Sequence, residues 1–241
     1  MTRVATLPRA VLLDLDDTIV DDSGAIQEAW LDACSACSNP RLPAEIASIR
    51  DWFWSDADRH RIGRLDLPVA RRQIVRMAMD RLDIRDEHLV DDSASRYETL
   101  RDKGLTLIPG AVETIQWLRS GGCKTALVTN GASAAQRAKI MRFNLESLFD
   151  AVLIEGELEY GKPDHRVFQA ALAGLDSAPD DTWMIGDNLM WDVAPAKALG
   201  MQGIWIDTYG LGLPQPTPCR PDRVVRALTE LRQQPRMQVT P

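Results

Sequence analysis

Apolar and polar residues follow two different patterns along this chain. From Thr106 onward, short apolar runs alternate with segments of helical periodicity, which is typical of a parallel sheet covered by helices. A further apolar run near the N-terminus, beginning at Ala10, has the composition of a strand buried on both faces. The later runs predict strands over 124–128, 151–155, 182–185 and 202–206, and helices over 111–120, 133–142, 164–173, a stretch ending at Leu199, and 222–233.

The segment between these strands has a different pattern. From Ala25 to about Leu100 no run reads as a strand, apolar residues recur at helical spacing, and Pro and Gly divide the segment into about four helices. We therefore predict an α/β fold with a Rossmann-like parallel sheet core flanked by helices, formed by residues 1–20 and 104–241. Residues 21–103 form an inserted all-helical domain in this prediction.

Composition narrows the class of protein. The 241-residue chain is 45% hydrophobic, and its formal net charge of −7 with a pI near 5.0 argues against nucleic acid or an anionic membrane as a partner. We expect a cytoplasmic protein, because no signal peptide or membrane-spanning run is evident and cysteines are few. Cys34 and Cys37 form a C-x-x-C without a second pair at zinc-ligand spacing. The oligomeric state is not predicted.

The first strand ends in three carboxylates, within the stretch from Ala10 to Thr18. Side chains alternate along a strand, so Asp14 and Asp16 project to the same side at its carboxyl end, where open α/β sheets bind ligands. Two like charges this close favour a bound cation. The alternative is a strand that runs into an acidic, solvated loop.

Two later features carry groups suited to phosphate. Leu127-Val128 runs into Thr129-Asn130-Gly131, whose hydroxyl, amide and backbone N–H groups are suitable donors at a loop entering a helix. Lys162, between Gly161 and Pro163, lies in a loop before a helix. Taken alone, the first is a common turn and the second is an ordinary solvated lysine.

A third feature adds carboxylates. The predicted strand 182–185 runs into Gly186-Asp187, and Asp192 follows about one helical turn into the next element. Asp187 would complete, with Asp14 and Asp16, a carboxylate-rich site of the kind that Mg²⁺ prefers. Asp192 is predicted to lie behind these ligands and to orient them.

In this order, the features resemble the four motifs of the haloacid dehalogenase (HAD) superfamily, the first written Asp-x-Asp-x-Thr, and the helical insertion resembles the C1 cap of that family. The resemblance implies a Mg²⁺-dependent phosphomonoester hydrolase acting on a small phosphorylated metabolite. Asp14 would be the nucleophile that forms an aspartyl-phosphate, and Asp16 the general acid and base. The implied phosphate-binding residues are Thr129, Asn130 and Lys162. The implied metal ligands are Asp14, Asp187 and, through its backbone carbonyl, Asp16.

Other functions remain open at this point. A 2-haloacid dehalogenase lacks the second acid of the first motif, whereas a sugar-phosphate mutase uses the same core residues. A phosphonatase would need a lysine in the cap, where Lys103 is the only one. A non-enzymatic binding protein would not need Asp16. Pro195 departs from the family pattern, which more often has Gly there, and is tolerated in the first turn of a helix.

The helical segment also carries aromatic and basic residues. Trp52, Phe53 and Trp54 are predicted to belong to the core of the bundle rather than to a substrate platform. Most of the arginines are expected to be solvated, and some to face an anionic substrate. These arginines are Arg59, Arg61, Arg64, Arg71, Arg72 and Arg76.

Overall fold

The computed structural model describes residues 7–23 and 26–232, apart from the side chains of residues 27 and 28. The chain divides into two compact units, one formed by residues 1–21 and 107–241 and the other by residues 22–106. The sequence predicted 21–103 for the inserted helical domain. Among the described residues, none of the helices has both the length and the apolar character that a membrane span requires.

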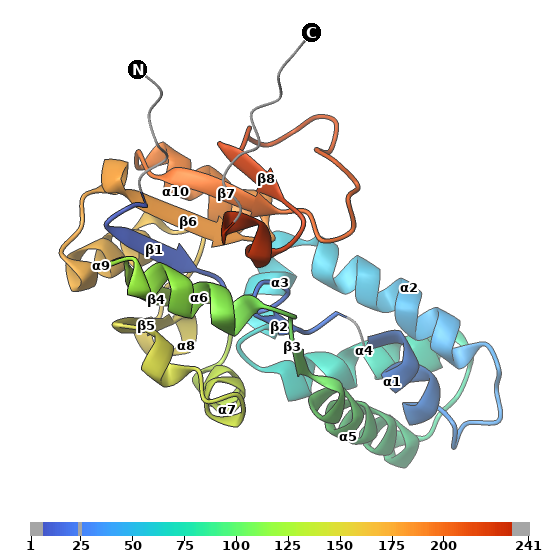
Figure 1. The fold of residues 1–241 in the computed structure, drawn as a ribbon. Helices are drawn as coiled ribbons and strands as arrows, with labels where there is room; N and C mark the ends of the chain where they lie inside the picture. The colour runs from blue at the N-terminus through green and yellow to red at the C-terminus, as the bar shows by residue number, and fades with distance from the viewer. Residues whose placement is uncertain (1–6, 24–25, 233–241) are drawn as a thin grey trace, which may run out of the picture. The chain divides into compact units, whose positions relative to one another are not determined.

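The first unit is built on one parallel sheet, with the strand order β5-β4-β1-β6-β7-β8 (Figure 1). β1, at the centre, pairs with β4 on one side and with β6 on the other. The strands are β1 (Ala10–Leu13), β4 (Lys124–Thr129), β5 (Ala151–Ile154), β6 (Thr182–Gly186), β7 (Gln202–Ile206) and β8 (Arg223–Val225). A separate two-stranded sheet joins β2 (Val20–Asp21) to β3 (Thr106–Leu107), where the chain leaves and re-enters this unit.

Helices pack on both faces of the sheet (Figure 1). On one face, Leu12, Val128 and Met184 meet Phe168 of α9 and Ala196 of α10 in one apolar cluster. Alternate strand residues thus face the same helices, as the period of two in a strand requires. The helices are α6 (Ala111–Ser120), α7 (Ser133–Arg142), α8 (Glu155–Leu158), α9 (His165–Leu175) and α10 (Ala194–Ala198). Shorter 3₁₀ turns are η1 (Glu146–Leu148), η2 (Pro179–Asp181) and η4 (Leu228–Arg232).

Apart from Thr106 of β3, the regular secondary structure in the described residues of the second unit is helical. Its core gathers apolar side chains from four of its helices, including Trp30 of α1, Ile49 of α2, Ile74 of α4 and Val90 of α5. The helices are α1 (Ile26–Ala33), α2 (Leu42–Ser55), α3 (Ala57–Gly63), α4 (Leu67–Arg81) and α5 (Glu87–Gly104). Three of them start at an aspartate whose carboxylate accepts a backbone N–H three residues later, which satisfies an otherwise unpaired donor. These aspartates are Asp56, Asp66 and Asp86.

The C-terminal prediction was wrong in part. We predicted one helix over 222–233, but Arg223–Val225 form the edge strand β8 and only Leu228–Arg232 turn as a 3₁₀ helix. β8 pairs in parallel with β7, so Trp205 lies opposite Val224. This pairing satisfies the β7 edge through contacts distant in sequence, which outweigh the local helical pattern.

Candidate functional site

All the predicted site residues except Lys162, which lies between α8 and α9, lie at the ends of three neighbouring strands of the first unit or follow them. Leu13, at the end of β1, lies opposite Leu127 of β4 and Ile185 of β6. The backbone N–H of Asp14 donates to Ile185 O at 3.0 Å, which holds residue 14 just beyond the sheet. The loops that follow β1, β4 and β6 therefore start at one edge, as expected for parallel strands.

Three carboxylates meet at this edge. Asp14, Asp187 and Asp192 each place a carboxylate oxygen within 4.8 Å of the others. Burial raises the pKa of Asp187 to about 9, with further contributions from Asp14, Asp192 and Asp17. Burial likewise raises the pKa of Asp14 to about 7; Lys162 opposes this shift, and Asp192 adds to it. Burial and mutual repulsion thus make it costly to ionise both Asp14 and Asp187.

Lys162 is the cation of this cluster. Lys162 is 2% exposed. Its ammonium group donates to Oδ1 of Asp14 and to Oδ1 of Asp192, each at 2.6 Å. Burial alone would lower the pKa of Lys162, but the two carboxylates outweigh burial and raise it. Lys162 therefore stays charged beside Asp14.

The side-chain amide of Asn130 binds the backbone of Lys162 and so positions this residue. Asn130 Oδ1 accepts from the N–H of Lys162 at 2.7 Å, and Asn130 Nδ2 donates to Lys162 O at 2.6 Å. The approach is so close that a Cβ added at Gly161 would lie 2.5 Å from Asn130 Oδ1. The phosphate-binding role predicted for Asn130 stays a prediction. Glu155, which the sequence analysis did not single out, accepts from Gly131 N at 2.9 Å and anchors the same loop.

Asp16 is held by α7. Gln136 Nε2 donates to Asp16 Oδ2 at 2.9 Å, and Lys139 Nζ lies 2.5 Å from Asp16 Oδ1. The same Gln136 nitrogen donates to Thr129 Oγ1 at 2.6 Å, so it links two of the predicted site residues. Sequence reasoning missed Gln136 and Lys139, although their spacing of three places them on one face of the predicted helix 133–142.

Asp192 is completely buried and sits at an irregular turn. It lies in the π-helical turn η3 (Leu189–Val193), which precedes α10. Its Oδ2 accepts from Asn188 N at 3.0 Å. A Cβ on Gly186 would overlap its carboxylate, so the glycine leaves room for this contact. Pro195 falls in the first turn of α10, the position where proline is tolerated.

A neighbouring strand fixes the backbone of Asp187. The indole Nε1 of Trp205, on β7, donates to Asp187 O at 2.7 Å. The sequence offered no sign of this contact, because it depends on the pairing of β6 with β7.

The donor set fits a small, hard divalent cation. Three carboxylates within 4.8 Å of one another supply the oxygen ligands that Mg²⁺ takes. Burial and the neighbouring carboxylates raise the pKa values of Asp14 and Asp187, so a bound cation would favour their ionised forms. The carboxylate of Asp16 is engaged with Lys139 and Gln136, and Asp192, predicted to stand behind the ligands, lies within the cluster. The predicted role of the Asp16 backbone carbonyl stays a prediction.

Comparison with known proteins agrees with this geometry. The family model of haloacid dehalogenase-like hydrolases matches residues 8–200. A phosphoserine phosphatase of Thermus thermophilus is 30% identical, over 92% of this chain and 97% of its own. A glyceraldehyde 3-phosphate phosphatase of Pyrococcus furiosus is 26% identical, over 84% of this chain and 81% of its own. A phosphoglycolate phosphatase of Pseudomonas putida is 27% identical, over 85% and 71%.

Solved structures show the same fold. YfnB of Bacillus subtilis, bound to magnesium, superposes with a TM-score of 0.74 at 21% identity, covering 93% of this chain and 97% of its own. L-2-haloacid dehalogenase of Xanthobacter autotrophicus gives a TM-score of 0.65 at 21% identity, with the same coverage. At these identities the structures establish the fold, and the sequence matches establish the family. This chain belongs to the haloacid dehalogenase-like hydrolases.

Proposed function

We propose that this protein is a Mg²⁺-dependent phosphomonoester hydrolase that acts on a small phosphorylated metabolite through an aspartyl-phosphate at Asp14. The observation that carries the proposal is the contact of Asp14 with Lys162 inside a buried cluster of carboxylates. A carboxylate approaches a dianionic phosphate only where positive charge offsets the repulsion. The phosphatases among the relatives support the same choice.

Asp14, Asp187 and Asp192 would hold the cation, with the backbone carbonyl of Asp16 as the predicted further ligand. A bound Mg²⁺ would supply positive charge to the phosphate oxygens and to Asp14. Lys162, with its raised pKa, would supply positive charge from the protein itself. Thr129 and Asn130 would bind oxygens of the transferring group.

The chemistry then takes two displacements. An oxygen of Asp14 attacks phosphorus, the bond from phosphorus to the ester oxygen breaks, and Asp16 gives its proton to the leaving alkoxide. In the second step Asp16 takes a proton from water, whose oxygen attacks the phosphorus of the aspartyl-phosphate. The bond between phosphorus and Asp14 breaks, and orthophosphate leaves. The carboxylate of Asp16 is 30% exposed, so a leaving group and water can reach it.

Asp16 also separates this proposal from the dehalogenase reaction. A halide leaves without a proton, so a dehalogenase has no use for a second acid at this position. The dehalogenases among the structural neighbours share the fold at low identity and carry no further argument. A sugar-phosphate mutase would use the same residues, but it would transfer the phosphoryl group to another hydroxyl of the sugar and release no orthophosphate.

A single assay tests the proposal. Phosphorylated metabolites are incubated with the protein in Mg²⁺ or in EDTA, and orthophosphate, rearranged sugar phosphate and halide from 2-haloacids are measured in parallel. We expect Mg²⁺-dependent release of orthophosphate that Asp14→Asn abolishes. Release that survives this substitution, or that ignores the metal, would refute the proposed function. Halide release or isomerised sugar phosphate would assign the chain to the other reactions.

A further inference from the structure

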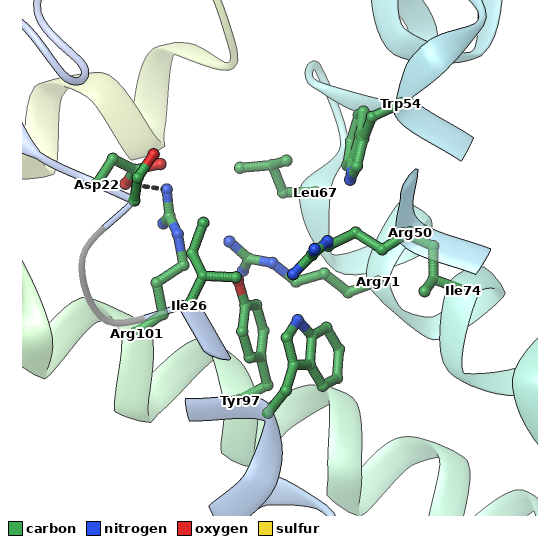
Figure 2. A pocket seen from close by; sticks show the side chains of 11 residues that line it. Asp22, Ile26, Arg50, Trp54, Leu67, Arg71, Ile74, Tyr97 and Arg101 are labelled. Atoms are coloured by element: carbon green, nitrogen blue, oxygen red, sulfur yellow. Dashed lines mark hydrogen bonds and ion pairs between the residues drawn. The ribbon is translucent and has the colours of Figure 1, made fainter. Parts of the chain in front are cut away.

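The helical unit contains a cavity of its own. It has a volume of about 510 Å³, within the range of small-molecule sites, and all its lining residues fall within 22–106. Figure 2 shows side chains from several helices around it, among them Arg50, Trp54, Arg71 and Arg101. Its geometry therefore depends on this unit alone.

The lining is cationic although the protein is acidic. Three arginines and one aspartate line the cavity, which gives the lining side chains a net charge of 3 − 1 = +2. Arg71 and Arg101 are 5% and 7% exposed. Burial lowers the pKa of Arg71, and the positive charge of Arg101 lowers it further. Buried guanidinium groups that repel each other are stabilised by an anion between them.

Each of the three arginines contacts a carboxylate. Arg71 Nη1 binds Glu98 at 2.9 Å, and Arg101 pairs with Asp22, the contact drawn in Figure 2. Arg50, whose side chain is 29% exposed, binds a single oxygen of Asp51 on the outer surface. Each guanidinium carries five N–H donors in a rigid fork that suits carboxylate and phosphate.

Aromatic rings form the other wall of the cavity. Trp30 and Tyr97, both lining residues, stack with ring centroids 3.7 Å apart. The guanidinium carbon of Arg71 lies 5.3 Å from the centre of the Tyr97 ring, which orients that arginine. The buried indole N–H of Trp30 has no hydrogen-bond partner among the residues that the structure describes. A ligand with one or more acidic groups on a compact carbon skeleton matches these walls.

We propose that this cavity binds the carboxylate or phosphate group of a small organic acid through Arg50, Arg71 and Arg101. The acid has two sources to consider: it is the part of the substrate that is not transferred, or it is a separate metabolite. The first source rests on the proposed function, and the second does not. From the sequence we predicted that some arginines of this segment face an anionic substrate. Under this proposal, Arg71 is the one of them that faces an anion.

The first experiment measures binding without catalysis. Malonate is titrated calorimetrically into the Asp14→Asn protein in EDTA, and then into the same protein carrying Arg71→Gln, Arg50→Gln or Arg72→Gln. We expect malonate to bind, and to bind about tenfold to a hundredfold more weakly after either change in the cavity. Arg72 is the matched control, because it lies next in the chain, is 46% exposed as a side chain and pairs with Asp91.

Folding of each variant is checked by circular dichroism and thermal unfolding. If Arg71→Gln fails to fold for want of its bond to Glu98, the more exposed Arg50→Gln still decides the question. Absence of malonate binding to the parent protein would overturn the proposal. Malonate affinity in both the Arg50→Gln and Arg71→Gln variants equal to that of the parent protein would overturn it too.

The second experiment separates the two sources. The protein with intact Asp14 is assayed with pairs of phosphate esters that differ by one carboxylate, such as 3-phosphoglycerate and glycerol 3-phosphate. If the substrate supplies the acid, Arg50→Gln raises KM at least tenfold for the carboxylated ester and leaves KM for the other unchanged. If a separate metabolite supplies it, both KM values are unchanged and malonate alters the rate in the parent protein alone. A protein without phosphatase activity would refute the proposed function and leave the calorimetric result standing.

Discussion

The ammonium group of Lys139 lies 2.5 Å from Oδ1 of Asp16, and Gln136 Nε2 lies 2.9 Å from Oδ2 of the same carboxylate. Both donors come from α7, which begins just after the loop that carries Asn130. Two donors on two oxygens determine the rotation of the carboxylate as well as its position. The orientation of the proposed general acid and base is therefore set by a helix that carries none of the predicted site residues.

Lys139→Met should reduce kcat about tenfold and change KM little, because Asp16 then loses one of its two fixed contacts. Lys139→Arg should recover part of the loss, since it restores a positive donor. Steady-state kinetics with an alkyl phosphate measures both, and Arg142→Met on the exposed side of the same helix is the control. An unchanged kcat in Lys139→Met would show that the contact has no part in turnover.

Asp16→Asn should divide substrates by their leaving groups. Attack on an alkyl phosphate should slow by about 10²–10⁴, because no acid protonates the alkoxide. p-Nitrophenol is a good leaving group and needs less help, so p-nitrophenyl phosphate should give a rapid burst followed by slow turnover. Stopped-flow absorbance measures the burst, whose size should match the enzyme concentration. Equal slowing of both esters without a burst would assign Asp16 to binding instead of proton transfer.

Stability without metal should fall as pH rises. The pKa values of Asp14 and Asp187, raised to about 7 and about 9, exceed the ordinary value of 3.8, so the folded state binds more protons than the unfolded state between about pH 4 and 9. The free energy of unfolding in EDTA should therefore decrease across that window. Asp187→Asn should flatten the decrease.

Mg²⁺ should offset the decrease in the free energy of unfolding most near pH 9, where Asp14 and Asp187 are most ionised. At one hundred times its Kd, a cation that binds only the folded state adds about 2.7 kcal/mol. Urea unfolding at several pH values, with and without Mg²⁺, checks both effects. Identical pH profiles for the parent protein and Asp187→Asn would contradict the assignment of Asp187 to the cluster.

Gly186→Ala should destabilise the protein by about 1–3 kcal/mol, because the new methyl group overlaps the carboxylate of Asp192, which is completely buried. The affinity for Mg²⁺ should fall with it. Gly174→Ala is the control: its Cβ would meet only Ala151, at 3.7 Å, and in a helix alanine is favoured over glycine. Equal stability of the two variants would show that Asp192 can move.

The local sequence pattern was sufficient to predict many helices and strands of the α/β unit. The helices 111–120 and 133–142 and the strand 202–206 have the bounds that their apolar spacing predicts. Each is delimited by its own residues, such as Gly121 after α6. The strands that precede Asp14, Asn130 and Asp187 were predictable for the same reason. The six-stranded sheet confirms the predicted α/β fold.

The remaining features depend on contacts between distant residues. The residues of β8 become a strand because β7 offers an open edge. Lys139 reads as one more polar residue of a surface helix until α7 packs beside Asp16. The bond from Trp205 to Asp187 and the gathering of Arg50, Arg71 and Arg101 around one cavity require the folded units. A single sequence carries no signal for such pairs.

The pairing of β2 with β3 has a consequence for how such a chain can be altered. The segment between β2 and β3 starts and ends in two paired strands, so the pairing holds its two ends side by side. A different module with neighbouring termini, or a short peptide bridge, can be grafted between Asp21 and Thr106 without changing the order of the six strands. The architecture thus lets the part of the chain that bears the arginine cavity be exchanged independently of the part that bears the aspartates.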